Sequence, residues 1–183
     1  MAGKRRKLIL FARYPVAGRV KTRLIPALGA EGAAALHRRL VLRTLRTAEA
    51  AARQAGAELE IRFDGGSEEA MRHWLGDSWL CRGQSDGDLG QRMAVAFEDS
   101  FREGSPATVI VGSDCPSLTP NVIAAAFDSL QSNSVVFGPA TDGGYYLIGL
   151  TRFVSELFQG VAWGTEAVLN QSLDILARKG CMP

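Results

Sequence analysis

The sequence has 183 residues, 46% of them hydrophobic and 22% charged, with a net charge of +2. This composition is typical of a soluble globular protein, so we expect residues 1–183 to form a single domain. The apolar run Leu8–Ala12 is too short for a signal peptide or a membrane span. Cys81, Cys115 and Cys181 fit neither a zinc pattern nor a disulfide framework, which favours a cytoplasmic location.

The small net charge hides a strong asymmetry along the chain. Residues 1–53 hold 13 Lys and Arg against two acidic residues, whereas residues 54–183 hold 8 basic and 17 acidic residues. Such a split predicts that the N-terminal part binds an anion, either nucleic acid or a phosphorylated small molecule.

The first predicted element is a strand at Leu8–Ala12, followed by a basic loop. The loop mixes Pro15 and Gly18 with four cations, and Gly18 permits close approach of a ligand to the backbone. The cations are Arg13, Arg19, Lys21 and Arg23. This pattern indicates a phosphate cradle, with a solvated basic loop as the alternative. It is neither a Walker A loop nor a dinucleotide fingerprint.

The longest predicted helix is Glu31–Gln54, in which apolar residues recur at helical spacing and the arginines lie mostly on the other faces. His37 and His73 are isolated in helical stretches, where we expect them to be structural or exposed. The arginine series is typical of a solvated helix face, with direct ligand contact as the alternative.

Alternating apolar residues over 59–63 indicate the second strand, and Asp64-Gly-Gly a turn. Ser67 is a good N-cap for a short helix that ends at Leu75. A brief third strand is predicted at Trp79–Arg82.

The segment Gln84–Gly90 contains a second candidate motif, followed by a helix that begins near Leu89. Asp86 and Asp88 have the D-x-D spacing with which glycosyltransferases hold a metal. Asp88 is also a good helix N-cap, and capping is the reading we favour for it.

The stretch Thr108–Thr119 organises the rest of the chain. Its β-branched run Val109–Val111 predicts a central strand buried on both faces, and Gly112 ends it. Asp114 then lies just past the carboxyl end of that strand, where ligands bind in open α/β sheets. Its carboxylate suits a divalent metal such as Mg²⁺, and capping of a turn is the alternative.

The chain after Thr119 predicts a helix over 119–132 and strands over 134–137 and 145–150. The connection of seven residues between the two strands cannot hold a crossover helix, so we expect one strand to be antiparallel to the rest.

That connection also contains the second acidic, glycine-rich element. Asp142, flanked by Gly143 and Gly144, can bind a metal or a hydroxyl, or it can simply form a turn. A last helix is predicted over 166–179, with Thr165 as its N-cap.

Four segments resemble one family of proteins in the expected chain order. They are Phe-Ala-Arg-Tyr-Pro-Val-Ala-Gly-Arg-Val-Lys-Thr-Arg-Leu, Gly-Asp-Leu-Gly-Gln-Arg-Met, Gly-Ser-Asp-Cys-Pro-Ser-Leu and Gly-Pro-Ala-Thr-Asp-Gly-Gly-Tyr-Tyr-Leu-Ile-Gly-Leu. The family is the bacterial GT-A-type glycosyltransferase-like family, some members of which are linked with arsenosugar biosynthesis. It is similar in turn to 2-phospho-lactate guanylyltransferase and molybdenum cofactor guanylyltransferase.

The resemblance implies a three-layer α/β/α GT-A fold, that of the nucleotide-diphospho-sugar transferases, with a mostly parallel mixed sheet. It also implies that Asp114 binds the metal, Mg²⁺ or Mn²⁺, and that Lys21 and Asp142 take part in catalysis. The residues expected to bind the nucleotide are Arg13, Gly18, Arg19, Lys21, Arg23, Gln84, Asp88 and Gly90. Those expected to face the substrate are Asp142, Gly143, Gly144 and Tyr145.

We therefore expect a metal-dependent transferase that acts on a nucleotide-activated donor, by glycosyl transfer from a nucleotide sugar. The alternative is nucleotidyl transfer from a nucleoside triphosphate to a small phosphorylated acceptor. A non-catalytic protein that binds nucleotide or RNA is a weaker rival, since no aromatic stacking platform accompanies the arginines. We expect no membrane partner. The family pattern continues beyond the last helix into a strand and an acidic segment, whereas this sequence stops at Pro183, so we expect a shortened or altered member.

Overall fold

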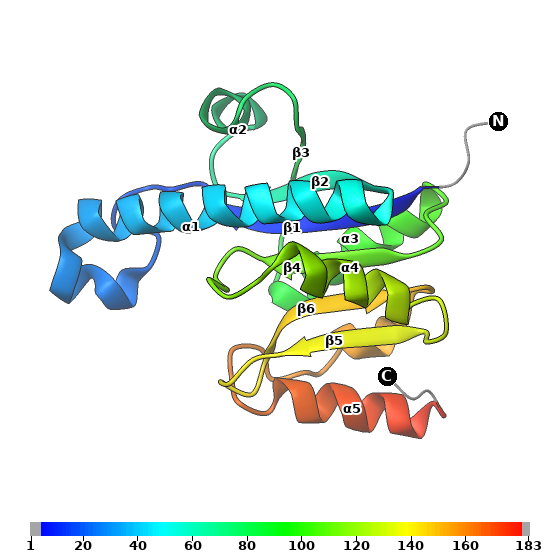
Figure 1. Cartoon of the computed structure of the whole chain (residues 1–183). Coiled ribbons are helices and arrows are strands. Elements are labelled where there is room, and N and C mark those ends of the chain that lie inside the picture. The colour runs from blue at the N-terminus through cyan, green and yellow to red at the C-terminus, as the bar shows by residue number, and fades with distance from the viewer. Residues whose placement is uncertain (1–4, 181–183) are drawn as a thin grey trace.

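The computed structural model describes residues 5–180, so the C-terminal stop lies outside the described residues. A central sheet is covered by helices on both faces, which confirms the expected three-layer α/β/α fold (Figure 1). The elements are β1 (Arg6–Arg13), η1 (Thr22–Leu24), α1 (Ile25–Ala55), β2 (Ala57–Asp64), α2 (Glu68–Leu75), β3 (Leu80–Gly83), α3 (Leu89–Arg102), β4 (Thr108–Gly112), α4 (Pro120–Ser129), β5 (Val135–Pro139), β6 (Tyr145–Leu150), η2 (Ser155–Phe158) and α5 (Val168–Arg178).

The sheet has the strand order β3-β2-β1-β4-β6-β5, and β6 is antiparallel to both of its neighbours. The antiparallel strand predicted from the short connection is therefore present. β1, β2, β3 and β4 pair in parallel, so their carboxyl ends share one edge of the sheet with the amino end of β6. In open α/β sheets, ligands bind among the loops at this edge.

Two apolar cores flank the sheet because successive strand residues point to opposite faces. Leu8 and Leu10 of β1 pack with α1, α2 and α4, whereas Ile9 and Phe11 pack with α3, η2 and α5. Figure 1 shows α1 and α4 together in front of the sheet, where they also contact each other.

The helix predicted over 31–54 begins earlier than expected. α1 runs over Ile25–Ala55, but Gly29 has φ 68° and ψ 167°, values outside the helical region. The positive φ suits glycine and breaks the first turn from the rest of the helix. As a result, the chain after β1 forms a lobe that extends beyond the sheet at the left of Figure 1.

A buried charge network replaces apolar packing on one face of β2. Glu60 and Arg62 are buried under α3, and Glu60 accepts a hydrogen bond of 3.1 Å from Lys7. Arg62 donates to Glu60 and to Asp99. Each buried charge is thereby paired, as burial in a low dielectric requires.

The last helix begins later than predicted, at Val168, and Ala167 occupies its N-cap position. The Thr165 hydroxyl instead donates to the Ala162 carbonyl and accepts from the Ala167 amide, so the predicted Thr165 cap is wrong. Ser67, by contrast, caps α2 as predicted, and the Thr119 side chain caps α4. None of the helices within residues 5–180 combines the length and apolar character needed to cross a membrane.

Candidate functional site

A cavity of about 300 Å³ opens at the carboxyl edge of the parallel strands. It is lined by residues from the ends of β1, β2 and β4, from the loops that follow β1, β3 and β4, from the middle of α1 and from the start of α3. They are Phe11, Ala12, Arg13, Val20, Lys21, His37, Asp64, Gln84, Leu89, Arg92, Gly112, Ser113 and Asp114. Four predicted site residues, Arg13, Lys21, Gln84 and Asp114, therefore share one cavity.

Asp114 lies past the end of β4, as predicted, and its side chain is 62% exposed. Lys21 Nζ lies 2.9 Å from Asp114 Oδ1, so the carboxylate pairs with a cation that is distant in sequence. The buried Thr44 hydroxyl lies 3.0 Å from the Leu40 carbonyl oxygen and 3.3 Å from the Ser113 carbonyl oxygen, so it sits between α1 and the loop after β4. The carboxylate thus lies exposed beside the cavity, paired with Lys21, rather than buried in a cap.

Asp64 lines the same cavity, although its Asp-Gly-Gly sequence predicts only a turn. Arg13 Nε donates to Asp64 Oδ2 at 2.8 Å, and Arg92 Nη1 lies 3.0 Å from the same oxygen. Burial alone would raise the pKa of Asp64, but the hydrogen bonds from Arg13 and Arg92 outweigh it and hold the pKa below its usual value. Arg13 is therefore tied to a carboxylate at the end of the neighbouring strand.

The floor of the cavity is fixed by hydrogen bonds to the backbone. Gln84 donates to the Arg62 carbonyl at 2.9 Å, and its own side-chain oxygen faces Arg92 at 3.5 Å. His37 is only 4% exposed, and its Nε2 lies 2.9 Å from the Arg13 carbonyl. Because that carbonyl can only accept, Nε2 donates, and Nδ1 is left without a partner among the described residues. His37 is thus structural, as expected, but it also belongs to the cavity wall.

The loop before α3 supplies structure more than ligand contacts. Asp88 accepts a hydrogen bond of 2.8 Å from the Gln91 amide, and the Gln91 side chain accepts from Asp88 N, which completes a capping box. The favoured capping role is present. Gly90 is buried where a Cβ would lie 2.3 Å from Trp163 Nε1 and 2.8 Å from the Phe158 carbonyl oxygen, so packing explains this glycine. Nucleotide binding by Asp88 or Gly90 stays a prediction.

Asp142 lies in the turn between β5 and β6, at the same sheet edge as Asp114. Its Oδ1 accepts a hydrogen bond of 3.1 Å from the Gly144 amide. The antiparallel ladder ends with the pair Val111 and Leu147, close to the carboxyl end of β4 and the amino end of β6. The two loops therefore leave the sheet at neighbouring points. A metal or acceptor role for Asp142 stays a prediction.

The remaining predicted residues differ in their surroundings. Gly143 has φ 82°, and a Cβ there would lie 2.1 Å from the Glu166 carbonyl oxygen. Tyr145 packs between Phe137 and Trp163, and burial raises its pKa. After β1, Gly18, Arg19 and Arg23 are exposed. Gly18 has φ 80°, a left-handed value that favours glycine.

The donor set suits a metal that brings further ligands with it. Within residues 5–180, no group of three or more His, Cys, Asp or Glu side chains is placed to hold a metal ion. Asp114 still offers a hard carboxylate at the strand edge, and Mg²⁺ needs only one or two carboxylates in addition to substrate phosphates and waters. The chain therefore fits a metal–phosphate complex better than a metal ion bound by protein alone.

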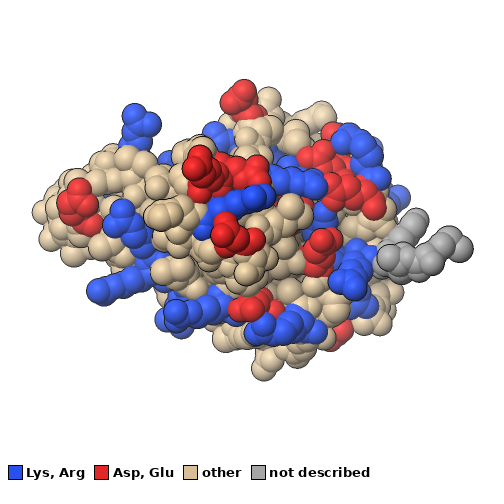
Figure 2. Space-filling model, turned by 90° about the horizontal axis from the view of Figure 1, so that it is seen from above, with Lys and Arg blue, Asp and Glu red and all other residues tan. Residues whose placement is uncertain are grey.

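Charges elsewhere on the surface are interleaved. Figure 2 shows acidic and basic side chains lying next to one another across the middle of the view.

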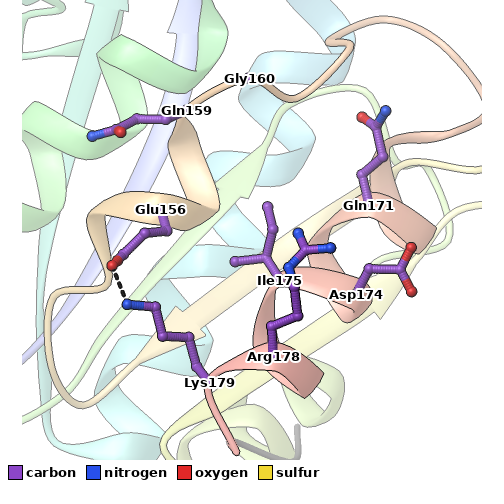
Figure 3. A pocket seen from close by; sticks show the side chains of 8 residues that line it. All are labelled: Glu156, Gln159, Gly160, Gln171, Asp174, Ile175, Arg178 and Lys179. Atoms are coloured by element: carbon purple, nitrogen blue, oxygen red, sulfur yellow. Dashed lines mark hydrogen bonds and ion pairs between the residues drawn. The ribbon is translucent and has the colours of Figure 1, made fainter.

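A separate cavity of about 480 Å³ lies between η2 and α5 (Figure 3). Glu156 and Lys179 form an ion pair beside it, and Ile175 forms part of its wall. None of the predicted site residues lines this second cavity.

Residues 46–165 match the family DUF2064, described as an uncharacterized protein conserved in bacteria. The chain belongs to this family. Among curated proteins, none matches the sequence. A DUF2064 assignment carries no reaction with it, so the activity must be argued from the site and from solved structures.

One solved structure resembles this DUF2064 protein closely. It comes from Desulfovibrio desulfuricans G20 and carries a provisional assignment as a nucleotide-diphospho-sugar transferase. The two sequences are 32% identical, with a TM-score of 0.89 over 97% of this chain and 78% of the other.

Two more distant structures resemble the DUF2064 chain in fold alone. CMP:2-keto-3-deoxy-manno-octonic acid synthetase, solved with CTP, is 12% identical with a TM-score of 0.55, over 97% of this chain and 87% of the other. Rv0371c from Mycobacterium tuberculosis H37Rv, solved with manganese, is 20% identical with a TM-score of 0.52, over 91% and 81% of the two chains. The fold is thus that of nucleotidyltransferases and nucleotide-diphospho-sugar transferases.

Proposed function

We propose that the cavity at the carboxyl edge binds the nucleotide of an activated donor and that the protein is a metal-dependent transferase. The observation that carries this proposal is the convergence of Arg13, Lys21 and Asp114 on one cavity from three separate segments. A cavity of about 300 Å³ is of the size that small-molecule ligands occupy. The likeness to structures solved with CTP and with manganese supports the same reading.

The charge of each site residue determines the role that we propose for it. Lys21 would meet the donor phosphates, with the exposed Arg19 and Arg23 of the same loop beside it. Asp114 would hold Mg²⁺ or Mn²⁺, and the bound metal would supply charge neutralisation on the phosphates. Asp142 would act on the acceptor, either as a base or through a hydrogen bond. The chain's own contribution is positioning and electrostatic complementarity to the departing group.

Glycosyl transfer and nucleotidyl transfer differ in what leaves. In the first, an acceptor hydroxyl displaces a nucleoside diphosphate from a nucleotide sugar. In the second, an acceptor phosphate displaces pyrophosphate from a nucleoside triphosphate. The provisional assignment of the Desulfovibrio structure favours the first. The single carboxylate at the end of β4, in place of a D-x-D pair, favours the second.

Isothermal titration calorimetry with nucleotide sugars and nucleoside triphosphates, each with Mg²⁺ or Mn²⁺, tests the proposal. We expect saturable, metal-dependent binding that Lys21→Ala weakens by about 1.5–3 kcal/mol, the usual worth of a charge-assisted contact. Arg46→Ala, on the exposed side of α1, is the matched control and should bind as the wild type does. Absence of binding to every nucleotide would refute the proposal. Release of nucleoside diphosphate or of pyrophosphate then separates the two reactions.

A further inference from the structure

The backbone of Lys21 is strained, and its side chain is held. Among residues 5–180, Lys21 alone combines a positive φ, 49°, with a side chain larger than that of glycine. Such residues persist where the surrounding structure fixes them, and they gather at functional sites. The Lys21 side chain is 21% exposed, whereas its partner Asp114 is 62% exposed. Lys21 is therefore the more buried member of the pair, and both residues line the cavity.

The carboxylates that line the cavity are already paired with cations of the chain. Three cations and two carboxylates line it, and both carboxylates are paired. Arg13 and Arg92 neutralise Asp64, and Lys21 neutralises Asp114. A lone divalent cation that approaches Asp114 must compete with an ammonium 2.9 Å away and enters a cavity with a surplus of positive charge. A nucleotide phosphate chain removes both obstacles, because it pairs with Lys21 and brings negative charge with the metal.

We infer that Lys21 acts as an internal stand-in for the metal, so that Asp114 binds the divalent ion only together with the nucleotide. This inference rests on the proposed function and adds an order of binding to it. In the free protein, the Lys21 ammonium occupies one oxygen of Asp114. With a metal–nucleotide complex in the cavity, Lys21 would pair with a phosphate oxygen and Asp114 would be free to hold the metal.

The inference predicts that Lys21→Met strengthens Mn²⁺ binding without nucleotide and weakens binding of the Mn²⁺–nucleotide complex. Lys21→Met removes the charge and keeps the length of the side chain. Mn²⁺ binding without nucleotide, measured by electron paramagnetic resonance, should tighten by at least about fivefold, because a competing unit charge near 4 Å is lost even in a water-like dielectric. Binding of the Mn²⁺–nucleotide complex, measured by calorimetry, should weaken by about tenfold or more. A merely structural lysine would not strengthen metal binding.

Two controls make the outcome unambiguous. Lys21→Arg keeps a cation at this position and should leave Mn²⁺ binding without nucleotide as weak as in the wild type. Arg46→Met removes a charge from the exposed side of α1 and should change neither titration. The inference is overturned if Lys21→Met binds free Mn²⁺ no more tightly than the wild type while the wild type binds Mn²⁺–nucleotide. If no nucleotide binds to the wild type, the proposed function fails, and the binding order fails with it.

Discussion

The ion pairs of Asp64 predict a specific dependence of stability on pH. Asp64→Asn removes the carboxylate that accepts from Arg13 and Arg92 but keeps the size of the side chain. Asp64 is 28% exposed and Arg13 is 52% exposed, so each pair is worth no more than about 1 kcal/mol, as exposed ion pairs usually are. With two such pairs lost, we expect the free energy of unfolding of the variant at pH 7 to fall by up to about 2 kcal/mol.

The sign of the pH effect follows from the lowered pKa of Asp64. A carboxyl group with a lower pKa in the folded state stabilises the fold above its unfolded pKa, near 3.9, and this contribution is lost as the pH falls through the folded pKa. Urea denaturation of wild type and Asp64→Asn at a series of pH values between 7 and 2 should give curves that converge at acid pH. Glu103, whose pKa is also lowered, contributes to both proteins and cancels in the difference. A difference that stays constant down to pH 2 would contradict the pairing.

Three further predictions concern the metal ligand, the packing of α3 and the rival function. The melting temperature of Asp114→Asn should lie within a few degrees of that of the wild type, because the side chain is 62% exposed. The variant should lose metal-dependent nucleotide binding, which electron paramagnetic resonance of Mn²⁺ would detect. Gly90→Ala should lower the free energy of unfolding in denaturant by about 1–3 kcal/mol, because its Cβ would clash with Trp163. Gly83→Ala places its Cβ in open space and should lower it far less. Equal losses in the two variants would contradict the packing around Gly90. Filter binding should detect no tight RNA complex, and RNA affinity with a steep salt dependence would favour the rival.

Much of the fold follows from local pattern. The β-branched run at Val109–Val111 identifies the central strand, and the short connection before Tyr145 predicts the antiparallel one. Caps at Ser67 and Thr119 locate two helix starts. Element boundaries do not follow from the pattern where an irregular residue decides them, as at Gly29, whose positive φ separates the first turn of α1 from the rest.

The site is harder to predict because its partners are distant in sequence. Asp64 pairs with an arginine 51 residues earlier, and a local reading of Asp-Gly-Gly gives only a turn. The position of Asp64 at the end of a strand beside β1 is the one signal that could have identified it. His37 carries no local signal, since only the packing of α1 brings it to the Arg13 carbonyl.

The charge asymmetry of the sequence also takes a different meaning in the fold. Lys7, Arg13 and Lys21 belong to the basic N-terminal part, and each pairs with an acid from the later part of the chain. Part of the N-terminal positive charge is therefore neutralised internally, which no count along the chain reveals. The anion site that we propose is the loop around Lys21 with the exposed Arg19 and Arg23.

The most direct test of the account is a crystal structure with Mn²⁺ and a nucleotide sugar, in which anomalous scattering locates the metal. We predict the manganese peak at the Asp114 carboxylate, the donor phosphates on Lys21, and the rest of the nucleotide in the cavity between Arg13 and Leu89. A nucleotide seated in the cavity between η2 and α5, or a metal away from Asp114 with the Lys21–Asp114 pair intact, would contradict it.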